Sequence, residues 1–399
     1  MTEWKTYKLG EICDYATNRT INIDNYISTE NMLPNKGGVC APSNVPNGAA
    51  VEYRVGDVLI SNIRPYFQKI WYADCDGACS ADVLCIRANN KTDSKYLYYL
   101  LSQQLFFDYV MAGAKGCKMP RGDKKQIMQW SISLPSLEEQ RRIVGILGAI
   151  DDKIENNRRI KDNLEKQAQA LYKQWFVDFE FPNEEGKPYK SSGGKMIDSE
   201  LGQIPEGWRV QTISDISVRI ASGGTPKSLN ESYYNGEIKW FTTKELKDCF
   251  LIDSEKHIST EALNDSAAKL FPKNTILMAI YAAPTVGRLG ILTTESTFNQ
   301  AAVGIIAKEE IGHIFVYLAL LAERENLNNL ASGAAQQNLN VGIVKQYKLI
   351  VPTEKLLIEF NQIAGSLFES IEVVSNENKT LATLRDTLLP KLMNGEIKL

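Results

Sequence analysis

Two long stretches of the chain repeat apolar residues at alternating steps of three and four positions. In residues 136–182 these positions are Ile143, Leu147, Ile150, Ile154, Leu164, Ala168, Leu171 and Trp175, with polar Asn157 and Lys161 interrupting the series. In residues 353–399 they are Phe360, Ala364, Leu367, Ile371, Val374, Leu381, Leu388 and Leu392, interrupted by Asn378 and Arg385. This heptad spacing predicts two helices of about 60 Å each, at 1.5 Å per residue, and each apolar seam needs a partner.

The simplest partner for each seam is the other helix of the same chain, which predicts an antiparallel pair of long coiled-coil helices. Two alternatives stay open: each helix packs only on its own domain, or the seams form an oligomer. Ser136-Leu137-Glu138-Glu139 has the pattern of a capping box, so it predicts where the first helix starts. Pro182 predicts where it stops, and Asn394-Gly395 predicts the C-cap of the second helix.

The chain also repeats itself on a larger scale. A shift of 217 positions aligns Val58-Leu59-Ile60 with Thr275-Ile276-Leu277, and Ile132-Ser133-Leu134-Pro135 with Leu349-Ile350-Val351-Pro352. The two helical seams superpose at the same shift. Upstream the shift is 204, which aligns Trp4 with Trp208. Two shifts on one pattern indicate duplication of a large unit, with loops of different length on a shared frame.

Each repeat has the mixed pattern of an α/β domain. The strand candidates are Asp57–Asn62, Val83–Arg87, Ser131–Leu134, Thr275–Ile280, Ala302–Ala307 and Tyr347–Val351, and the helix candidates are Ser94–Met111 and His313–Asn329. Residues 183–204 are rich in Gly, Ser and Pro, which is typical of a linker. The predicted organisation is a mixed α/β fold with similar domains at 1–135 and 205–352, long helices at 136–182 and 353–399, and a linker at 183–204.

Charge is distributed unevenly along the 399 residues. The formal net charge is -3, which by itself argues weakly against a nucleic-acid partner. Residues 111–130, however, carry five basic residues against one acid, Asp123. A local basic patch can bind phosphate while the whole chain stays acidic. No apolar run of about 18 residues and no apolar signal region at the N-terminus occur, so we expect a cytoplasmic protein without a membrane contact.

Several loops of both repeats collect the side chains that bind DNA. Arginine reads guanine edges, glutamine and asparagine read adenine edges, and lysine or backbone amides near glycine hold phosphates. The candidate DNA-binding residues are Arg64, Tyr66, Gln68, Lys69, Lys115, Lys118, Arg121, Gly223, Gly224, Thr225, Lys227, Arg288, Gln336, Gln337 and Asn338. Each loop alone is weak support, and their placement at matching positions of both repeats strengthens the set.

The residues that carry catalysis are largely missing. Only two histidines occur, His257 and His313, and the chain has no phosphate-binding loop, dinucleotide fingerprint or amino-methyltransferase motif. Cys75, Cys79 and Cys85 cluster, but no second Cys or His pair stands at zinc spacing, which favours buried thiols. Glu237-Ile238-Lys239 imitates part of a metal nuclease motif, a tripeptide that is common by chance. We therefore predict no catalytic residues, no metal site and no cofactor on this chain.

One junction and several short motifs resemble a known family. The run Leu134-Pro135-Ser136-Leu137-Glu138-Glu139-Gln140-Arg141-Arg142-Ile143-Val144 before a long helix resembles the specificity subunit of type I restriction-modification systems. So do Gly207-Trp208, Ser222-Gly223-Gly224-Thr225-Pro226 and Phe298-Asn299-Gln300. The resemblance covers nearly the whole chain. The second junction, Pro352-Thr353-Glu354-Lys355-Leu356, departs from it because the Glu-Gln-Arg run is missing.

The resemblance implies a function in defence against foreign DNA. Each target-recognition domain would read one half of a split sequence in double-stranded DNA. The helices would set the spacing between the halves and dock two methyltransferase subunits. S-adenosylmethionine would bind to those partners, and ATP and Mg would serve the restriction subunits of the full complex. The competing hypothesis is a scaffold that assembles proteins through its helices without reading DNA.

Overall fold

The computed structural model describes residues 4–42, 44–281, 285–332 and 338–399. The chain divides into two compact units, which are described separately: residues 1–154 with 380–399, and residues 155–379. None of the helices in the described ranges combines the length and apolar character that crossing a bilayer requires.

The first unit is built around a four-stranded antiparallel sheet in the order β2-β8-β5-β6. Its strands are β1 (Lys5–Lys8), β2 (Cys13–Tyr15), β3 (Arg19–Thr20), β4 (Ala50–Tyr53), β5 (Val58–Ser61), β6 (Ile70–Tyr72), β7 (Gly77–Cys79), β8 (Val83–Ala88) and β9 (Ser131–Leu134). Its short helices are α1 (Ser94–Leu101), α2 (Gln104–Ala112) and α3 (Lys124–Ile127). A smaller sheet β3-β4-β7 and the pair β1-β9 complete the unit.

The second unit repeats this frame with a longer main sheet, β13-β20-β17-β18-β15. Its strands are β10 (Met196–Ser199), β11 (Gly202–Pro205), β12 (Arg209–Thr212), β13 (Ser217–Ser222), β14 (Ile238–Phe241), β15 (Cys249–Leu251), β16 (Lys256–Ile258), β17 (Ile276–Ala279), β18 (Leu289–Leu292), β19 (Thr297–Phe298), β20 (Ala302–Ala307) and β21 (Lys348–Val351). Its short helices are α5 (Thr260–Asn264), α6 (His313–Ala322), α7 (Arg324–Ser332) and α8 (Val341–Gln346). The smaller sheet β16-β14-β19 and the pairs β12-β21 and β10-β11 complete it.

Strand register confirms the duplication at both shifts. In the first unit β1 pairs β9 with Lys5 opposite Leu134, and in the second β12 pairs β21 with Arg209 opposite Val351. The first members of these pairs differ by 204 positions and the second members by 217. The two units therefore share one frame, and the 13 extra residues of the second unit lie in loops between the segments aligned at 204 and those aligned at 217.

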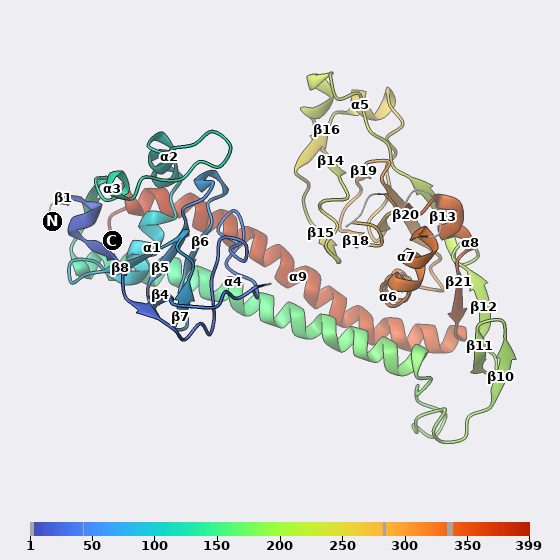
Figure 1. The fold of residues 1–399 in the computed structure, drawn as a ribbon. Helices are drawn as coiled ribbons and strands as arrows, with labels where there is room; N and C mark the ends of the chain where they lie inside the picture. Colours follow the sequence, from blue (N-terminus) through green and yellow to red (C-terminus); the bar gives the residue numbers. More distant parts are fainter. Residues whose placement is uncertain (1–3, 43, 282–284, 333–337) are drawn as a thin grey trace. The chain divides into compact units, whose positions relative to one another are not determined.

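Two long helices run through both units: α4 (Leu137–Tyr172) and α9 (Glu354–Met393). In the first unit Ile143 and Leu147 of α4 share one core with Leu389 and Leu392 of α9. In the second unit the other end of α4 and the start of α9 lie in one core, in which Phe360 contacts Tyr172. The start of one helix thus meets the end of the other, and Figure 1 shows them side by side. The predicted antiparallel pair is confirmed.

Three of the polar residues that interrupt the two seams bind polar side chains of the opposite helix. In the second unit the buried Asn157 donates from Nδ2 to Asn378 Oδ1 at 3.0 Å and to Glu377 Oε2 at 2.7 Å. In the first unit Arg385 donates to Asp151 Oδ1 at 3.1 Å. Three of the four polar interruptions therefore have a polar partner on the other helix, whereas Lys161 pairs with Glu165 of its own helix. The three partnered positions define a register for the pair.

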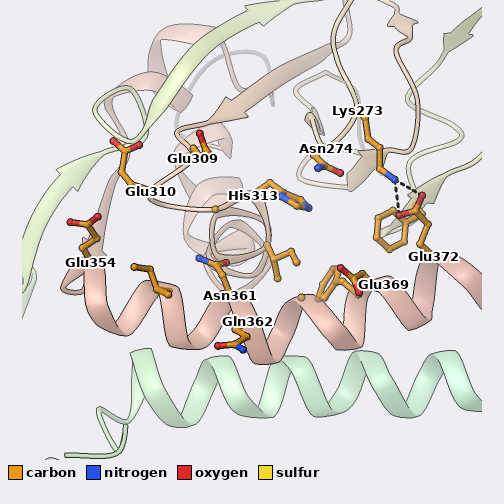
Figure 2. A pocket seen from close by; sticks show the side chains of 16 residues that line it. Lys273, Asn274, Glu309, Glu310, His313, Glu354, Asn361, Gln362, Glu369 and Glu372 are labelled. Carbon is orange, nitrogen blue, oxygen red and sulfur yellow. Dashed lines mark hydrogen bonds and ion pairs between the residues drawn. The ribbon is translucent and has the colours of Figure 1, made fainter.

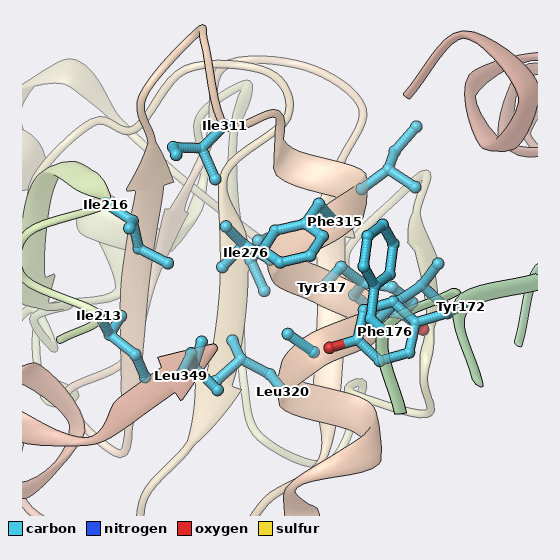
Figure 3. Packing of buried hydrophobic residues seen from close by; sticks show 14 of the residues in the cluster. Tyr172, Phe176, Ile213, Ile216, Ile276, Ile311, Phe315, Tyr317, Leu320 and Leu349 are labelled. Carbon is cyan, nitrogen blue, oxygen red and sulfur yellow. The ribbon is translucent and has the colours of Figure 1, made fainter. Parts of the chain in front are cut away.

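Aromatic rings tie the end of α4 to the second domain. The helix continues into a five-residue π turn, Lys173–Val177, in which Phe176 lies 5.1 Å from Phe315 of α6 and 4.7 Å from Phe360, measured between ring centroids. Figure 3 shows Tyr172, Phe176 and Phe315 gathered in this core. The stop predicted at Pro182 is wrong, because the helical path ends at Val177 and Phe179 takes a left-handed φ of 60°.

Two predicted helices are each two helices, and the predicted linker is partly folded. Ser94–Met111 breaks after Leu101 because Ser102 Oγ bonds the Tyr98 carbonyl and Gln103 turns extended. His313–Asn329 breaks at Glu323. Within 183–204, residues Met196–Ser199 pair with Gly202–Pro205 as a hairpin. The predicted C-cap is confirmed, because Gly395 follows α9 with a φ of 76°.

Candidate nucleic-acid interface

Two of the predicted DNA-binding loops of the first unit come together in space. The tip of the β5–β6 hairpin holds Arg64, Tyr66, Gln68 and Lys69, and the other loop runs from 115 to 121. Ile63 forms a bridge with Arg121, and the Arg64 amide donates to the Pro120 carbonyl at 2.8 Å. Sequence alone placed these residues in separate loops about 50 positions apart, so their union is a product of the fold.

The hairpin tip is held rigidly in an uncommon conformation. Arg64 and Gln68 both adopt left-handed backbone angles with φ of 50°, and a 3-10 turn, Pro65–Phe67, lies between them. The amide of Asn35 donates to the Phe67 carbonyl at 2.8 Å, and that of Lys36 to the Gln68 carbonyl at 3.0 Å. Non-glycine residues keep such angles only where neighbouring structure fixes them, and they gather at functional sites.

The cations of this region divide into paired and unpaired groups. Lys115 contacts Asp123 at 3.1 Å, which lowers the pKa of that carboxyl, and Arg121 contacts Asp82 at 3.3 Å. Both basic side chains remain more than half exposed. Arg64 and Lys118 are exposed and make no side-chain hydrogen bond or ion pair with a residue in the described ranges. These four cations can reach phosphates or base edges.

Lys69 has a different environment from these cations. Its ammonium donates to the Thr29 carbonyl at 2.7 Å, and the side chain is half-buried. Gln68 bonds the side chain of Gln104 at the start of α2. Both residues therefore brace the hairpin tip against neighbouring segments in the unbound protein.

In the second unit, packing accounts for two of the candidate glycines. Gly223 and Gly224 are buried, and an added Cβ would lie 2.1 Å from the Phe298 carbonyl oxygen and 2.2 Å from Ala267, respectively. Trp240 Nε1 also donates to the Gly224 carbonyl at 2.9 Å. These glycines permit close packing of the main chain.

The neighbouring side chains of this loop are accessible. Thr225 is exposed and hydrogen-bonded to Gln300, and Lys227 is exposed. Arg288 is half-buried in the β17–β18 hairpin. Asn338 is half-buried, and Gln336 and Gln337 lie outside the described residues.

The duplication identifies a surface residue that residue-type reasoning missed. Tyr281 lies 217 positions after Arg64, just after β17 at the corresponding hairpin, and 40% of its surface is exposed. Phe67, beside Tyr66, is also absent from the candidate residues, although 38% of its surface is exposed. The exact shift between the repeats could have pointed to Tyr281.

The residues considered for catalysis have structural explanations. The side chain of Lys239 bonds the Ile252 carbonyl, and burial lowers the pKa of His313 to about 4. Cys79 and Cys85 are buried, and burial raises the pKa of both thiols. Across the described ranges, no three His, Cys, Asp or Glu residues lie close enough together to hold a metal ion.

A groove of about 780 Å³ runs along α9 in the second unit. Figure 2 shows its two walls, with Glu354, Glu369 and Glu372 on α9 and Glu309 and Glu310 before α6. One cation, Lys273, lines the groove and contacts Glu372 at 2.9 Å. The other four carboxylates make no hydrogen bond or ion pair with a described residue. The negative charge of this groove repels a DNA backbone and is compatible with a protein partner.

Comparison with known proteins identifies the family. Residues 1–166 and 205–381 match the model of the type I restriction modification DNA specificity domain, so both repeats are covered. The chain belongs to this family. It is a DNA specificity subunit of a type I restriction-modification system, in which recognition and not catalysis is the role of this subunit.

Several relatives support the assignment. The specificity subunit of the type I restriction enzyme HindI of Haemophilus influenzae is 28% identical, and the match covers 100% of both chains. That of MjaIX of Methanocaldococcus jannaschii is 29% identical over 76% of this chain and 69% of the relative. The crystal structure of a type I S subunit from M. genitalium has the same fold, with a TM-score of 0.59, 17% identity and coverage of 98% of this chain and 96% of that one.

Proposed function

We propose that each of the two domains, 1–135 and 205–352, reads one half of a bipartite target in double-stranded DNA. The observation that carries the proposal is the duplicated frame with its loops: one strand register recurs at shifts of 204 and 217, while the loop sequences on it differ. Similar frames that carry different loops suit two different half-sites, each read in a similar geometry.

In the first domain the readers would be the hairpin tip and the loop that packs on it. Arg64, Lys118, Arg121 and Lys115 would supply phosphate and base contacts, with Tyr66 among them. In the second domain Thr225, Lys227 and Arg288 would do so, with Gln336, Gln337 and Asn338 on a further loop. Gln68, Lys69, Gly223 and Gly224 would act mainly by holding these loops in shape, because their contacts are internal.

The two long helices would set the distance between the half-sites and dock the catalytic partners. A coiled-coil pair with defined polar partners is a stiff spacer, and its length scales at 1.5 Å per residue. We propose that two methyltransferase subunits dock against these helices. The acidic groove along α9, with buried Phe250 and Phe368 at its base, offers one such face. S-adenosylmethionine, ATP and Mg would be bound by the methyltransferase and restriction subunits.

The decisive experiment maps adenine methylation across a genome in cells that express this chain with its methyltransferase subunit. A bipartite motif that appears only when this chain is present supports the proposal. In parallel, binding of the purified complex to that motif should weaken steeply with salt, with a slope set by the number of phosphates neutralised. A folded, co-purifying complex that methylates no motif would contradict the proposal.

A further inference from the structure

The tip of the β5–β6 hairpin exposes two aromatic rings side by side. Tyr66 is 49% exposed and Phe67 38%, and their ring centroids lie 4.6 Å apart. Pro65 between them and the strand is buried, so the turn is anchored while its rings face outward. A folded protein ordinarily turns such rings inward, and exposed aromatic pairs therefore mark contact sites.

The backbone of this tip is prepared for its exposed conformation. The two left-handed residues are fixed by hydrogen bonds with three other segments: the Arg64 amide donates to the Pro120 carbonyl, and Gln68 accepts from the Lys36 amide and donates from its side chain to Gln104. Within the tip, the Phe67 amide donates to the Arg64 carbonyl at 3.0 Å. The rings are therefore held on a rigid support, which reduces the conformational entropy that the tip would lose on binding.

The surroundings of the rings select the chemistry of the partner. Residues 61–69 and 115–121 together contain five basic residues (Arg64, Lys69, Lys115, Lys118 and Arg121) and no acid. Asp123 and Asp82 pair with Lys115 and Arg121, and the surface keeps a net positive charge. A partner of this surface must combine dense negative charge with flat apolar faces. Stacked bases between phosphates have both properties, whereas an apolar protein surface lacks the charge.

From this juxtaposition we infer that Tyr66 and Phe67 form a wedge that stacks against bases of the half-site read by the first domain and opens one base step. The inference rests on the proposed function and adds a mode of recognition to it. Apolar side chains of DNA-binding proteins unstack a base step in this way and kink the duplex. The half-site would then be selected partly by how easily that step deforms, without a hydrogen bond to its bases.

The second repeat supplies an independent parallel. Its corresponding hairpin, between β17 and β18, exposes Tyr281 at 40%. Arg288 lies in the same connection between the two strands, so an exposed ring and a cation occur on one hairpin in both repeats although the two tips share few residues.

The test uses the complete complex of this chain with its methyltransferase subunits on duplexes that carry the mapped motif. 2-Aminopurine, whose fluorescence rises when it unstacks, replaces each purine of the first domain's half-site in turn. The methylated adenine is left out because methyltransferases extrude their target base themselves. The wild-type complex should raise the fluorescence severalfold at one step.

The double variant Tyr66→Ala/Phe67→Ala should abolish this rise and weaken binding by tenfold or more, with an unchanged salt slope. Tyr66→Phe is the matched control that keeps both rings, and it should retain both the rise and the affinity. Equal melting temperatures would show that the exposed rings were not needed for folding. An undiminished rise in the double alanine variant, or no rise at any position under bound wild type, overturns the wedge.

A second pair of substitutions separates the wedge from the proposed function. Arg64→Ala/Lys118→Ala should lower the salt slope by about 2, at about 0.9 per phosphate contact, and leave the fluorescence rise intact at saturating protein. Binding and methylation that persist without unstacking refute the wedge alone. A wild-type complex that does not bind the motif refutes the proposed function, and the wedge with it.

Discussion

Asn157 offers a quantitative test of what the polar pair in the helix seam does. Its side chain is fully buried, its Nδ2 donates to Asn378 and to Glu377, and its Oδ1 is buried with no hydrogen-bond partner among the described residues. The two bonds contribute about 2–4 kcal/mol, one of them to a charged acceptor, and the unsatisfied oxygen costs about 1–3 kcal/mol. The net contribution of the amide is therefore small.

Two substitutions at this position should have opposite effects. Asn157→Leu removes both contributions and adds about 1.5–3 kcal/mol of apolar burial, so it should melt at or above the wild type. Asn157→Ala gains no such burial and leaves a small void, so it should be less stable by about 1–2 kcal/mol. At roughly 2–4 °C per kcal/mol, a loss of 1–2 kcal/mol places the melting temperature of the alanine variant about 2–8 °C below that of the leucine variant in differential scanning fluorimetry.

The same substitutions should separate stability from specificity of pairing. A seam without its paired asparagines, as in Asn157→Leu/Asn378→Leu, accepts other registers and other copies of the helix more readily. Mass photometry should therefore detect more dimer for this stable double variant than for the wild type. A leucine variant that melts with the alanine variant, well below the wild type, would refute the reasoning and show that the hydrogen bonds stabilise the pair.

Four further predictions concern other parts of the chain. Asp57 is buried and bound to Arg87 at 2.6 and 2.8 Å, so Asp57→Asn should lower the free energy of unfolding in urea by about 3–5 kcal/mol. Glu52→Gln, at the exposed pair with Arg54, should change it by less than about 1 kcal/mol, and equal effects would contradict the burial argument. Burial lowers the pKa of His313 from 6.5 to about 4, so the folded state disfavours protonation of this side chain. The free energy of unfolding should therefore be unaffected above pH 6.5 and fall by up to about 3 kcal/mol as the pH drops to 4. His313→Gln should reduce this loss, and identical pH profiles of variant and wild type would refute the prediction. Inserting four helical residues in both α4 and α9 adds about 6 Å and should lengthen the gap in the methylated motif by about two base pairs, and unchanged spacing would refute the spacer role. Exchange of residues 205–352 for the corresponding domain of a relative should alter one half-site only, and changes in both half-sites would refute separable domains.

Local pattern was sufficient to predict the architecture of the chain. The heptad series predicted α4 and α9 because a buried seam on a helix requires that spacing, and the shifts of 204 and 217 reappear as strand registers. Strands β9 and β20 begin and end where their patterns do, at Ser131–Leu134 and Ala302–Ala307. These features depend on burial of one face, which the sequence records directly.

Features that depend on single hydrogen bonds, or on contacts between distant segments, could not be predicted from that pattern. The break between α1 and α2 follows from the hydrogen bond of Ser102 to Tyr98, and apolar periodicity continues through it. The left-handed turn at Phe179 depends on packing against Trp208, at 5.5 Å between ring centroids. The union of the Arg64 and Arg121 loops likewise follows from backbone bonds, so residue types identified the cationic members without showing that they share one surface.

The order in which the ribosome delivers these segments has a consequence for biosynthesis. The core of the first unit includes Leu389, Leu392 and Met393, and the Cβ position of Gly395 lies 3.4 Å from Trp4. Between Ile154 and Thr380, the whole second unit must be translated, which takes roughly 10–45 s at 5–20 residues per second. During that interval the nascent first domain exposes the apolar face that α9 later covers. Until residues 380–399 emerge from the ribosome, this apolar face stays uncovered and open to binding by chaperones.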